Sequence, residues 1–129
     1  MKIPETLQNK KILIVDDVTS IRMLIRSILL DAGFKHVTEA KNGKEAINKL
    51  NHRHIDLIIC DWNMPIMSGL ELFREIHSKT EVEPAFIMLT SSSEAEKVNA
   101  AINSGVTNYL LKPFNAVTLI KHVLQALDD

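Results

Sequence analysis

The amino-acid sequence predicts an α/β fold in which helices cover both faces of a parallel β-sheet. Short, strongly apolar runs rich in β-branched residues recur along the chain, and segments with helical apolar spacing separate them. Such runs are typical of strands that are buried on both faces. Strands that alternate with helices favour a doubly wound parallel sheet with right-handed crossovers. We therefore expect a (βα)5 domain with a five-stranded parallel sheet.

Five short segments are expected to form the strands. Each is four to six residues long, which is an ordinary strand length. The segment over residues 36–40 has the weakest apolar pattern. The five segments are Ile12–Val15, His36–Ala40, Ile55–Cys60, Ala85–Leu89 and Val106–Leu111.

Two helices are predicted from apolar stripes with i, i+3, i+4, i+7 spacing. The first stripe comes before Gly33, which is placed to end the helix in the left-handed conformation. The second stripe lies near the C-terminus. The stripes consist of Ile21, Leu24, Ile25, Ile28 and Leu29, and of Val117, Ile120, Leu124 and Leu127.

The other helices are predicted mainly from signatures of helix N-termini. Ser68–Glu71 and Ser93–Glu96 both have the serine and glutamate spacing of a capping box, and Gly105 is placed to end the second of these helices. Asn42-Gly43 precedes a shorter helical pattern. That pattern consists of Ala46, Ile47 and Leu50.

The composition is that of one soluble globular domain. Of 129 residues, 46% are hydrophobic and 24% charged, and 15 basic residues against 16 acidic ones leave a net charge of −1. This balance gives no electrostatic argument for binding nucleic acid or an anionic membrane, and no apolar run approaches the roughly 20 residues of a membrane-spanning helix. Cys60, the single cysteine, cannot form an internal disulfide, which fits a reducing cytoplasm. We expect one cytoplasmic domain over residues 1–129, in which residues 1–10 lack a signal-peptide core and form a loosely held lead-in.

Polar residues gather where the expected strands end. In an open parallel sheet, ligands bind at the carboxyl ends of the strands, and neighbouring strands are only about 5 Å apart. Side chains from different strands should therefore meet at this edge. The residues at these ends are Asp16 and Asp17 after the first strand, Asp61 after the third, Thr90, Ser91 and Ser92 after the fourth, and Lys112 and Pro113 after the fifth.

Three of these side chains are carboxylates, which repel each other unless a cation neutralises them. Oxygen ligands with room for water suit Mg²⁺. Lys112 adds a positive charge and Thr90 a hydroxyl, so the cluster is suited to stabilising a phosphoryl group. Asp61 is the expected attachment point, because a carboxylate can act as a nucleophile and form an aspartyl phosphate. Taken alone, Asp16 and Asp17 slightly favour a turn and a helix cap over a ligand site.

Four stretches that contain these residues together resemble the receiver domain of two-component response regulators. They read ILIVDDVTSIRMLIRSILLDAGF, DWNMPIMSGLELFREI, IMLTS and NYLLKPF. The resemblance runs from about Lys11 to Leu127 and is strongest to the stand-alone chemotaxis type. It implies a flavodoxin-like fold with the strand order 2-1-3-4-5, for which the chemotaxis receiver is a standard example.

The resemblance implies a role for each residue of the cluster. Asp61 is the implied phospho-acceptor. Asp17 and Asp61 are the implied carboxylate ligands of Mg²⁺, with Asp16 acting on the metal through water and the backbone carbonyl of Asn63 as the third protein ligand. Asn63 and Ser92 are the positions implied to tune the lifetime of the phosphoryl group.

A conformational switch is also implied by the resemblance. Thr90 is expected to move towards the phosphoryl group, Lys112 to pair with it, and Tyr109 to report the movement through its rotamer. The Lys112–Pro113 peptide bond is expected to be cis, a form essentially confined to proline. Without the resemblance, Tyr109 is simply a core aromatic residue whose hydroxyl reaches the surface.

The implied molecule is a signalling switch and not an enzyme, because it promotes only its own phosphorylation and dephosphorylation. The implied partners are a histidine kinase, a phosphatase and a separate output protein that binds the fourth helix, fifth strand and fifth helix. The chain is expected to be a monomer.

Ser93–Glu96 is acidic where the family's motor-binding protein carries lysines, and residues 104–110 lack the acidic residues through which many DNA-binding regulators dimerise. A chemotaxis motor partner, a phosphate sink and a phosphorelay intermediate therefore all stay open.

Two other classes of function compete with the switch. A Mg²⁺-dependent phosphatase with an aspartyl nucleophile needs a second acid–base residue nearby, but the residue two positions past Asp61 is Asn63, and 129 residues leave no room for a cap domain. A flavodoxin-like cofactor binder needs a phosphate-cradling loop after the first strand, where Asp16 and Asp17 place two negative charges. Both interpretations are weaker than the switch.

Ordinary structural roles are expected for several other conspicuous residues. Trp62, beside the acceptor, is expected to be a partly exposed lid, and Cys60 a small buried hydrophobic residue. Arg22 and Arg26 are expected on the solvated side of the first helix. The His-Arg-His sequence at residues 52–54 is expected in a solvated loop, because a metal site would need further ligands.

Overall fold

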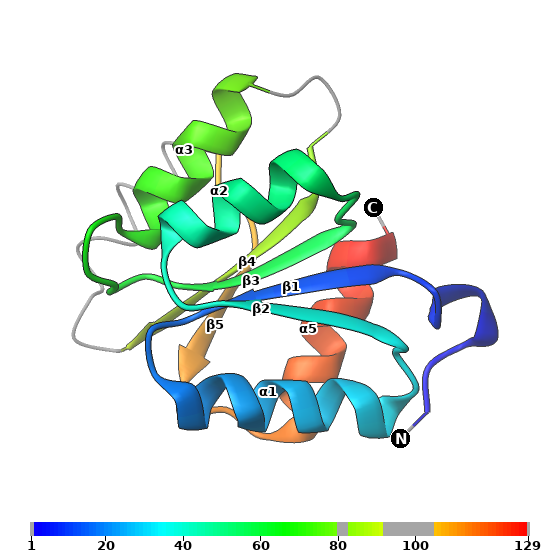
Figure 1. The fold of residues 1–129 in the computed structure, drawn as a ribbon. Coiled ribbons are helices and arrows are strands. Elements are labelled where there is room, and N and C mark those ends of the chain that lie inside the picture. The colour runs from blue at the N-terminus through cyan, green and yellow to red at the C-terminus, as the bar shows by residue number, and fades with distance from the viewer. Residues whose placement is uncertain (1, 80–82, 92–104, 129) are drawn as a thin grey trace.

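A computed structural model describes residues 2–79, 83–91 and 105–128. Its centre is a five-stranded parallel sheet with the strand order β2-β1-β3-β4-β5, which confirms the doubly wound fold (Figure 1). The strands are β1 (Lys11–Val15), β2 (His36–Ala40), β3 (Leu57–Asp61), β4 (Ala85–Ser91) and β5 (Tyr109–Lys112).

Helices cover both faces of the sheet. On one face lie α1 and α5, and on the other lie α2 and α3 (Figure 1). Their bounds are α1 (Thr19–Ala32), α2 (Gly43–His52), α3 (Gly69–Lys79) and α5 (Ala116–Asp128), and a short 3-10 helix, η1 (Glu5–Leu7), precedes β1. The helix expected between Ser93 and Gly105 lies outside the described residues. None of the helices in the described ranges is long and apolar enough to cross a membrane.

Two hydrophobic cores lie on opposite faces of the sheet, which explains why the strands read as continuous apolar runs. In β1, Leu13 and Val15 contribute to the core beneath α2 and α3, whereas Ile12 and Ile14 contribute to the core beneath α1 and α5. Because successive side chains of a strand point to opposite faces, a strand between two cores needs an apolar residue at every position.

The observed strands β3 and β5 begin later than expected. Ile55 and Val106 are buried, but neither pairs in a strand, since β3 begins at Leu57 and β5 at Tyr109. The apolar runs in the sequence therefore predict which residues are buried better than they predict which residues pair in the sheet. At the other end, β3 and β5 extend by one residue and β4 by two beyond the expected bounds, so that the polar residues of the predicted site are themselves the last residues of these strands.

The helix ends predicted at Gly33, Ser68 and Asn42 are confirmed. Gly33 has a φ of +115° and its N–H donates to the carbonyls of Leu29 and Leu30, as in a left-handed helix cap. Ser68 and Glu71 form a reciprocal capping box, in which the Glu71 N–H donates to Ser68 Oγ and the Ser68 N–H to Glu71 Oε1. Asn42 caps α2.

The N-terminal segment differs from the loosely held lead-in that the sequence suggested. Ile3 is only 5% exposed, and its N–H donates to the Ala32 carbonyl at 2.8 Å. The Lys35 N–H donates to the Gln8 carbonyl at 3.0 Å. These contacts join residues 3–8 to the end of α1 and the start of β2.

The buried faces of α1 and α5 differ in part from the predicted apolar stripes. Ile25 and Leu29 are fully buried as expected, but Leu24 is 47% exposed. In α5, Leu119, Ile120 and Val123 are buried, whereas Val117 is 51% exposed.

Candidate functional site

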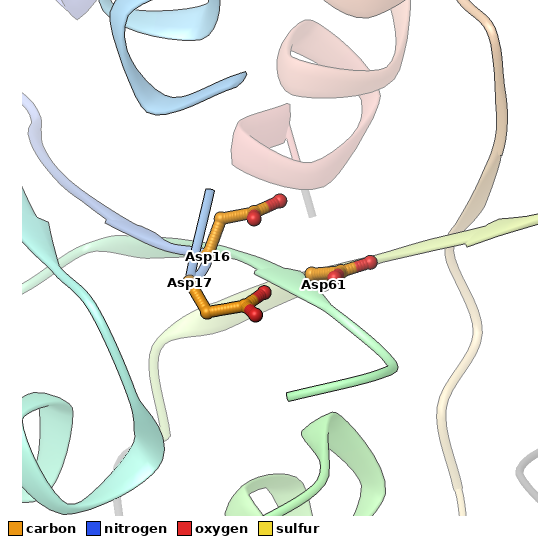
Figure 2. Close-up of side chains that lie close together, drawn as sticks. All are labelled: Asp16, Asp17 and Asp61. Atoms are coloured by element: carbon orange, nitrogen blue, oxygen red, sulfur yellow. The ribbon is translucent and has the colours of Figure 1, made fainter. Parts of the chain in front are cut away.

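Three carboxylates meet at the carboxyl edge of the sheet, as predicted. Asp16 and Asp17 follow β1 directly, and Asp61 is the last residue of β3 (Figure 2). One oxygen from each carboxylate lies within 4.8 Å of the other two. Asp16 is fully buried and Asp61 is 7% exposed, whereas Asp17 is exposed. The cluster is therefore closed by protein on the Asp16 side and open to solvent on the Asp17 side.

Lys112 joins this cluster from the end of β5. Its Nζ lies 2.8 Å from Asp61 Oδ1 and 3.6 Å from Asp16 Oδ2. The Lys112–Pro113 bond that follows is cis, as expected. Lys112 thus pairs with two of the three carboxylates, and its single positive charge leaves the cluster with excess negative charge.

The backbone around Asp16 is fixed by hydrogen bonds. Its N–H donates to the Ala40 carbonyl at 3.1 Å, and its Oδ1 accepts from the Val18 N–H at 2.9 Å. Asp16 Oδ2 is buried 3.6 Å from Lys112 Nζ and has no hydrogen-bond partner within the described part of the chain. A buried carboxylate oxygen without a donor is costly, so this atom indicates a position for a cation or a donor from outside the chain. The turn-forming role considered for Asp16 is also confirmed, because Asp16 Oδ1 accepts the Val18 N–H two residues later and so stabilises a turn.

The protonation equilibria reflect this imbalance. Burial raises the pKa of Asp61 and of Asp16 above the ordinary value of 3.8, because Lys112 offsets only part of the desolvation and of the repulsion between the carboxylates. Burial alone would lower the pKa of Lys112, but the bond to Asp61 and the charges of Asp61 and Asp16 outweigh it, so that this pKa is raised. The ammonium group is thus held in its charged form beside the two acids.

Thr90 and Tyr109 lie on the strands next to this cluster. Thr90 is 1% exposed and follows Leu89, the β4 residue in register with Asp61. Tyr109 begins β5, where it is half-buried and its hydroxyl donates to the Val106 carbonyl at 3.0 Å. The hydroxyl therefore bonds within its own loop in this state. The coupled movement expected of the two side chains stays a prediction.

Asn63 is exposed and lies two residues past the end of β3. A metal-ligand role for its carbonyl stays a prediction, and Ser92 lies outside the described residues. Cys60 is fully buried, as expected, and burial raises its thiol pKa well above the ordinary range, so that the thiol is unreactive.

Trp62 is not the partly exposed lid that the sequence suggested. It is 4% exposed and belongs to the core beneath α2 and α3. The backbone N–H of Trp62 donates to the Leu89 carbonyl at 3.0 Å, and the backbone carbonyl of Trp62 accepts from the Gly69 N–H at 2.8 Å. The loop from β3 to α3 therefore turns back on itself and carries the indole inward.

Gly69, where α3 begins, is a site residue that the sequence analysis did not identify. A Cβ atom at this position would lie 2.5 Å from the Asp61 carbonyl oxygen and 2.8 Å from Met88 Sδ. The helix can approach the acceptor this closely only because residue 69 has no side chain. The signal was present in the sequence as a glycine inside the capping box.

Arg22 is a second residue whose place was predicted incorrectly. Its side chain is only 13% exposed, and its Nη1 donates to the backbone carbonyl of Asp16 at 2.6 Å. Arg26 is half-buried against β2. Neither arginine is simply solvated. The contact of Arg22 with Asp16 could have been anticipated only from its position one turn into the helix that follows the acidic pair.

Comparison with known proteins agrees with this geometry. The family model described as the response regulator receiver domain matches residues 12–124. The chemotaxis protein CheY-3 of Vibrio cholerae is 37% identical over 113 residues, which cover 87% of each protein. The chemotaxis protein CheY of Pseudomonas aeruginosa is 36% identical over 110 residues, or 84% of this chain and 89% of the relative.

Solved structures share the fold over almost the whole chain. The chemotaxis response regulator CheY4 of Vibrio cholerae has a TM-score of 0.82 and 38% sequence identity, covering 92% of this chain and 99% of the other. A response regulator from Chloroflexus aurantiacus has a TM-score of 0.86 and 27% identity, covering 94% of this chain and 99% of the other.

Proposed function

Because the chain belongs to the response regulator receiver domain family, we propose that it accepts a phosphoryl group on Asp61 from a histidine kinase in a Mg²⁺-dependent reaction. The observation that carries the proposal is the set of neighbours around Asp61. Two further carboxylates and the Lys112 ammonium surround it at the open edge of the sheet. That set supplies a nucleophile, a cation site and a fixed positive charge at one point.

The proposed reaction needs no acid–base residue of its own. An oxygen of Asp61 attacks phosphorus in a phosphohistidine of the kinase, and the P–O bond forms as the P–N bond breaks. The electron pair of the broken bond leaves with the imidazole. Lys112 already contacts Asp61 Oδ1 at 2.8 Å, so its ammonium is in place to pair with the phosphoryl oxygens of the product.

The residues present fit a divalent cation. They offer oxygen ligands only, and the exposed Asp17 leaves room for water. The buried Asp16 Oδ2 has no hydrogen-bond donor in the described ranges. Asp17, Asp61 and the Asn63 carbonyl would hold Mg²⁺, and Asp16 would act through water. A bound Mg²⁺ would neutralise the carboxylates and withdraw charge from the phosphoryl oxygens.

The proposed output is a change of binding partner. Phosphorylation adds a charge of about −1.5 to −2 at neutral pH, which favours movement of Thr90 and Lys112 towards Asp61 and inward rotation of Tyr109. The surface that contains β5 and α5 then binds a separate protein differently, by a population shift between two states. Kinship with chemotaxis proteins supports a role in chemotaxis signalling.

In this proposal the chain is a monomeric switch and not an enzyme acting on other substrates, and a phosphatase acts on it. Its cytoplasmic location stays a prediction. The alternative of a small-molecule phosphatase gains no support, since the family match covers residues 12–124 and the position two past Asp61 carries an exposed asparagine.

Intact-mass analysis after incubation with a small-molecule phosphodonor tests the proposal. We expect one added phosphoryl group in the presence of Mg²⁺, and none with a chelator or in the Asp61→Asn variant. The Asp17→Asn variant should keep the fold and need a higher Mg²⁺ concentration. An adduct of equal yield on Asp61→Asn would contradict the proposal.

A further inference from the structure

Arg22 connects three elements beside the acidic cluster. From the first turn of α1, its Nη1 donates to the Asp16 carbonyl at the end of β1 at 2.6 Å, and its Nε to Glu39 Oε1 in β2 at 3.1 Å. Its Nη2 donates to Thr19 Oγ1 at 3.2 Å. With 13% of the side chain exposed, the guanidinium is mostly removed from water, and each of its nitrogens has an acceptor. This is the planar, multiple bonding for which arginine is suited and lysine is not.

The bond to Asp16 completes the restraint of that residue. The Asp16 N–H is held by the Ala40 carbonyl, its Oδ1 by the Val18 N–H, and its carbonyl by Arg22. Among the residues that the structure describes, Asp16 Oδ2 has no hydrogen-bond donor. The Asp16 carbonyl is also part of the peptide unit that leads to Asp17. Arg22 therefore restrains the peptide plane from which the exposed Asp17 side chain reaches the cluster.

Glu39 holds the guanidinium in this position. It accepts from Arg22 through Oε1 and lies 3.6 Å from Arg26 Nη1 through Oε2, while Lys49 Nζ donates to its backbone carbonyl. Glu39 is thus fixed from α1 and from α2. A restrained carboxylate can orient the arginine as a partner outside a metal site orients a ligand.

From these contacts we infer that Arg22, braced by Glu39, is a positioning residue that holds Asp16 and Asp17 in the geometry that binds Mg²⁺. The inference rests on the proposed function. It separates Arg22 from its neighbour Arg26, which makes the same kind of bridge from α1 to β2 but touches no residue of the cluster. Arg26 donates to the Val37 carbonyl at 2.9 Å and contacts the same Glu39.

Two effects of Arg22 on Mg²⁺ binding have opposite signs. Its positive charge near the cluster repels a cation, so charge alone predicts that removing Arg22 strengthens Mg²⁺ binding. Its bond to the Asp16 carbonyl orders the ligands, so positioning predicts that removal weakens binding. Residues that orient metal ligands typically change affinity by about 10-fold or more, and we expect positioning to dominate.

The test compares Arg22→Met with the matched control Arg26→Met. Mg²⁺ affinity is measured on the full chain by titration of Trp62 fluorescence, and thermal unfolding without Mg²⁺ is measured separately. We expect Arg22→Met to weaken Mg²⁺ binding about 10-fold. Arg26→Met removes only the second arginine contact of Glu39 and should weaken Mg²⁺ binding far less. Arg22→Lys, which keeps the charge but not the three-way bonding, should also weaken it. Glu39→Gln removes the negative charge that holds Arg22, and its Mg²⁺ affinity should lie between those of Arg22→Met and the wild type.

Several results would overturn the inference. Unchanged or stronger Mg²⁺ binding by Arg22→Met would show that the charge of Arg22 outweighs its positioning role. An equal loss of Mg²⁺ affinity in Arg22→Met and Arg26→Met would show a general effect of stability. If Arg22→Met does not fold, Arg22→Lys and Glu39→Gln decide by the same criteria. A wild type that is not phosphorylated and gives no response to Mg²⁺ would reject the proposed function, and this inference with it. A phosphorylated, Mg²⁺-binding wild type with an unaffected Arg22→Met would reject the inference alone.

Discussion

The two ends of strand β3 each carry an aspartate, and their environments are opposite. At the amino end, Asp56 Oδ2 accepts from the Lys11 N–H at 2.7 Å and Oδ1 lies 2.8 Å from His54 Nε2. At the carboxyl end, Asp61 shares the Lys112 ammonium with Asp16, and Asp17 adds a third carboxylate to the cluster. Five residues apart, one carboxylate is fully partnered and the other is left in a site with excess negative charge.

The pKa values follow the same contrast. Burial opposes ionisation of Asp56, but the bonds from Lys11 and His54 outweigh it, so the pKa of this carboxyl is lowered. Burial and the neighbouring acids raise the pKa of Asp61 and Asp16. The amino end therefore stabilises the fold through its charge, whereas the carboxyl end keeps a charge imbalance that a bound cation can relieve. Perturbed carboxyls of this kind concentrate at functional sites.

The largest expected effect comes from disturbing the packing of the carboxyl end. Gly69→Ala places a Cβ atom 2.5 Å from the Asp61 carbonyl oxygen, so α3 or the end of β3 must shift. We expect a loss of about 3 kcal/mol in the free energy of unfolding, measured by urea denaturation. Ser68→Ala, which removes the cap of the same helix without touching Asp61, should cost only about 1 kcal/mol. Equal losses in the two variants would mean that Gly69 is not needed for the close approach.

A smaller loss is expected from removing the carboxylate at the amino end. Asp56→Ala leaves the Lys11 N–H without its acceptor and His54 without its partner. We expect it to lower the free energy of unfolding by about 1 to 2 kcal/mol at neutral pH. Asp56→Asn retains an oxygen acceptor and should lose less, and an Asp56→Ala variant as stable as the wild type would contradict the contrast between the ends.

The smallest effect has the opposite sign. Asp16→Asn removes a buried charge from the cluster while an amide oxygen can still accept from the Val18 N–H. Without Mg²⁺ at neutral pH, we expect the free energy of unfolding to rise by about 1 kcal/mol. The exposed Asp31→Asn on α1 serves as the control and should change stability by less than about 0.5 kcal/mol. A destabilised Asp16→Asn would mean that its charge supports the fold.

The direction of the pH dependence distinguishes the same two ends. A carboxyl whose pKa is raised on folding binds more protons in the folded state, so stability from Asp16 and Asp61 is lost as pH rises from 3.8 through their folded pKa values. For Asp56 the pKa is lowered, so its contribution is present above 3.8 and is lost as pH falls through the folded value. In Asp16→Asn, the decrease in stability above pH 3.8 should be smaller than in the wild type.

Most of the fold could be predicted because the three inner strands β1, β3 and β4 lie between two cores, so that most of their residues are apolar. The errors came from residues whose surroundings are decided by distant parts of the chain. Ile55 and Val106 are buried without strand pairing, and Ile3 is an isolated apolar residue whose pairing with Ala32 leaves no periodic signal. Trp62 is buried because the loop from β3 turns back to Gly69, which the sequence around it does not specify.

The cluster itself could be predicted because parallel strands bring their carboxyl ends together, so that position alone placed Asp16, Asp61 and Lys112 in one site. Arg22 could not be placed in this way, since its acceptor is a backbone carbonyl, which any residue provides. The hydrogen-bonded pair of His54 and Asp56 was missed for a related reason. Its members are two residues apart and meet only because Asp56 turns towards β1 to accept from Lys11.

The most direct test of the account is to locate the phosphoryl group. Borohydride reduces an aspartyl phosphate to homoserine, so the protein is treated with phosphodonor and Mg²⁺, reduced, digested and sequenced by mass spectrometry. We predict homoserine at position 61 and at no other aspartate, with none formed when Mg²⁺ is chelated. Homoserine at Asp17 or Asp56, or the same yield at position 61 without Mg²⁺, would contradict the claim that the carboxyl end of β3 is a cation-dependent phospho-acceptor.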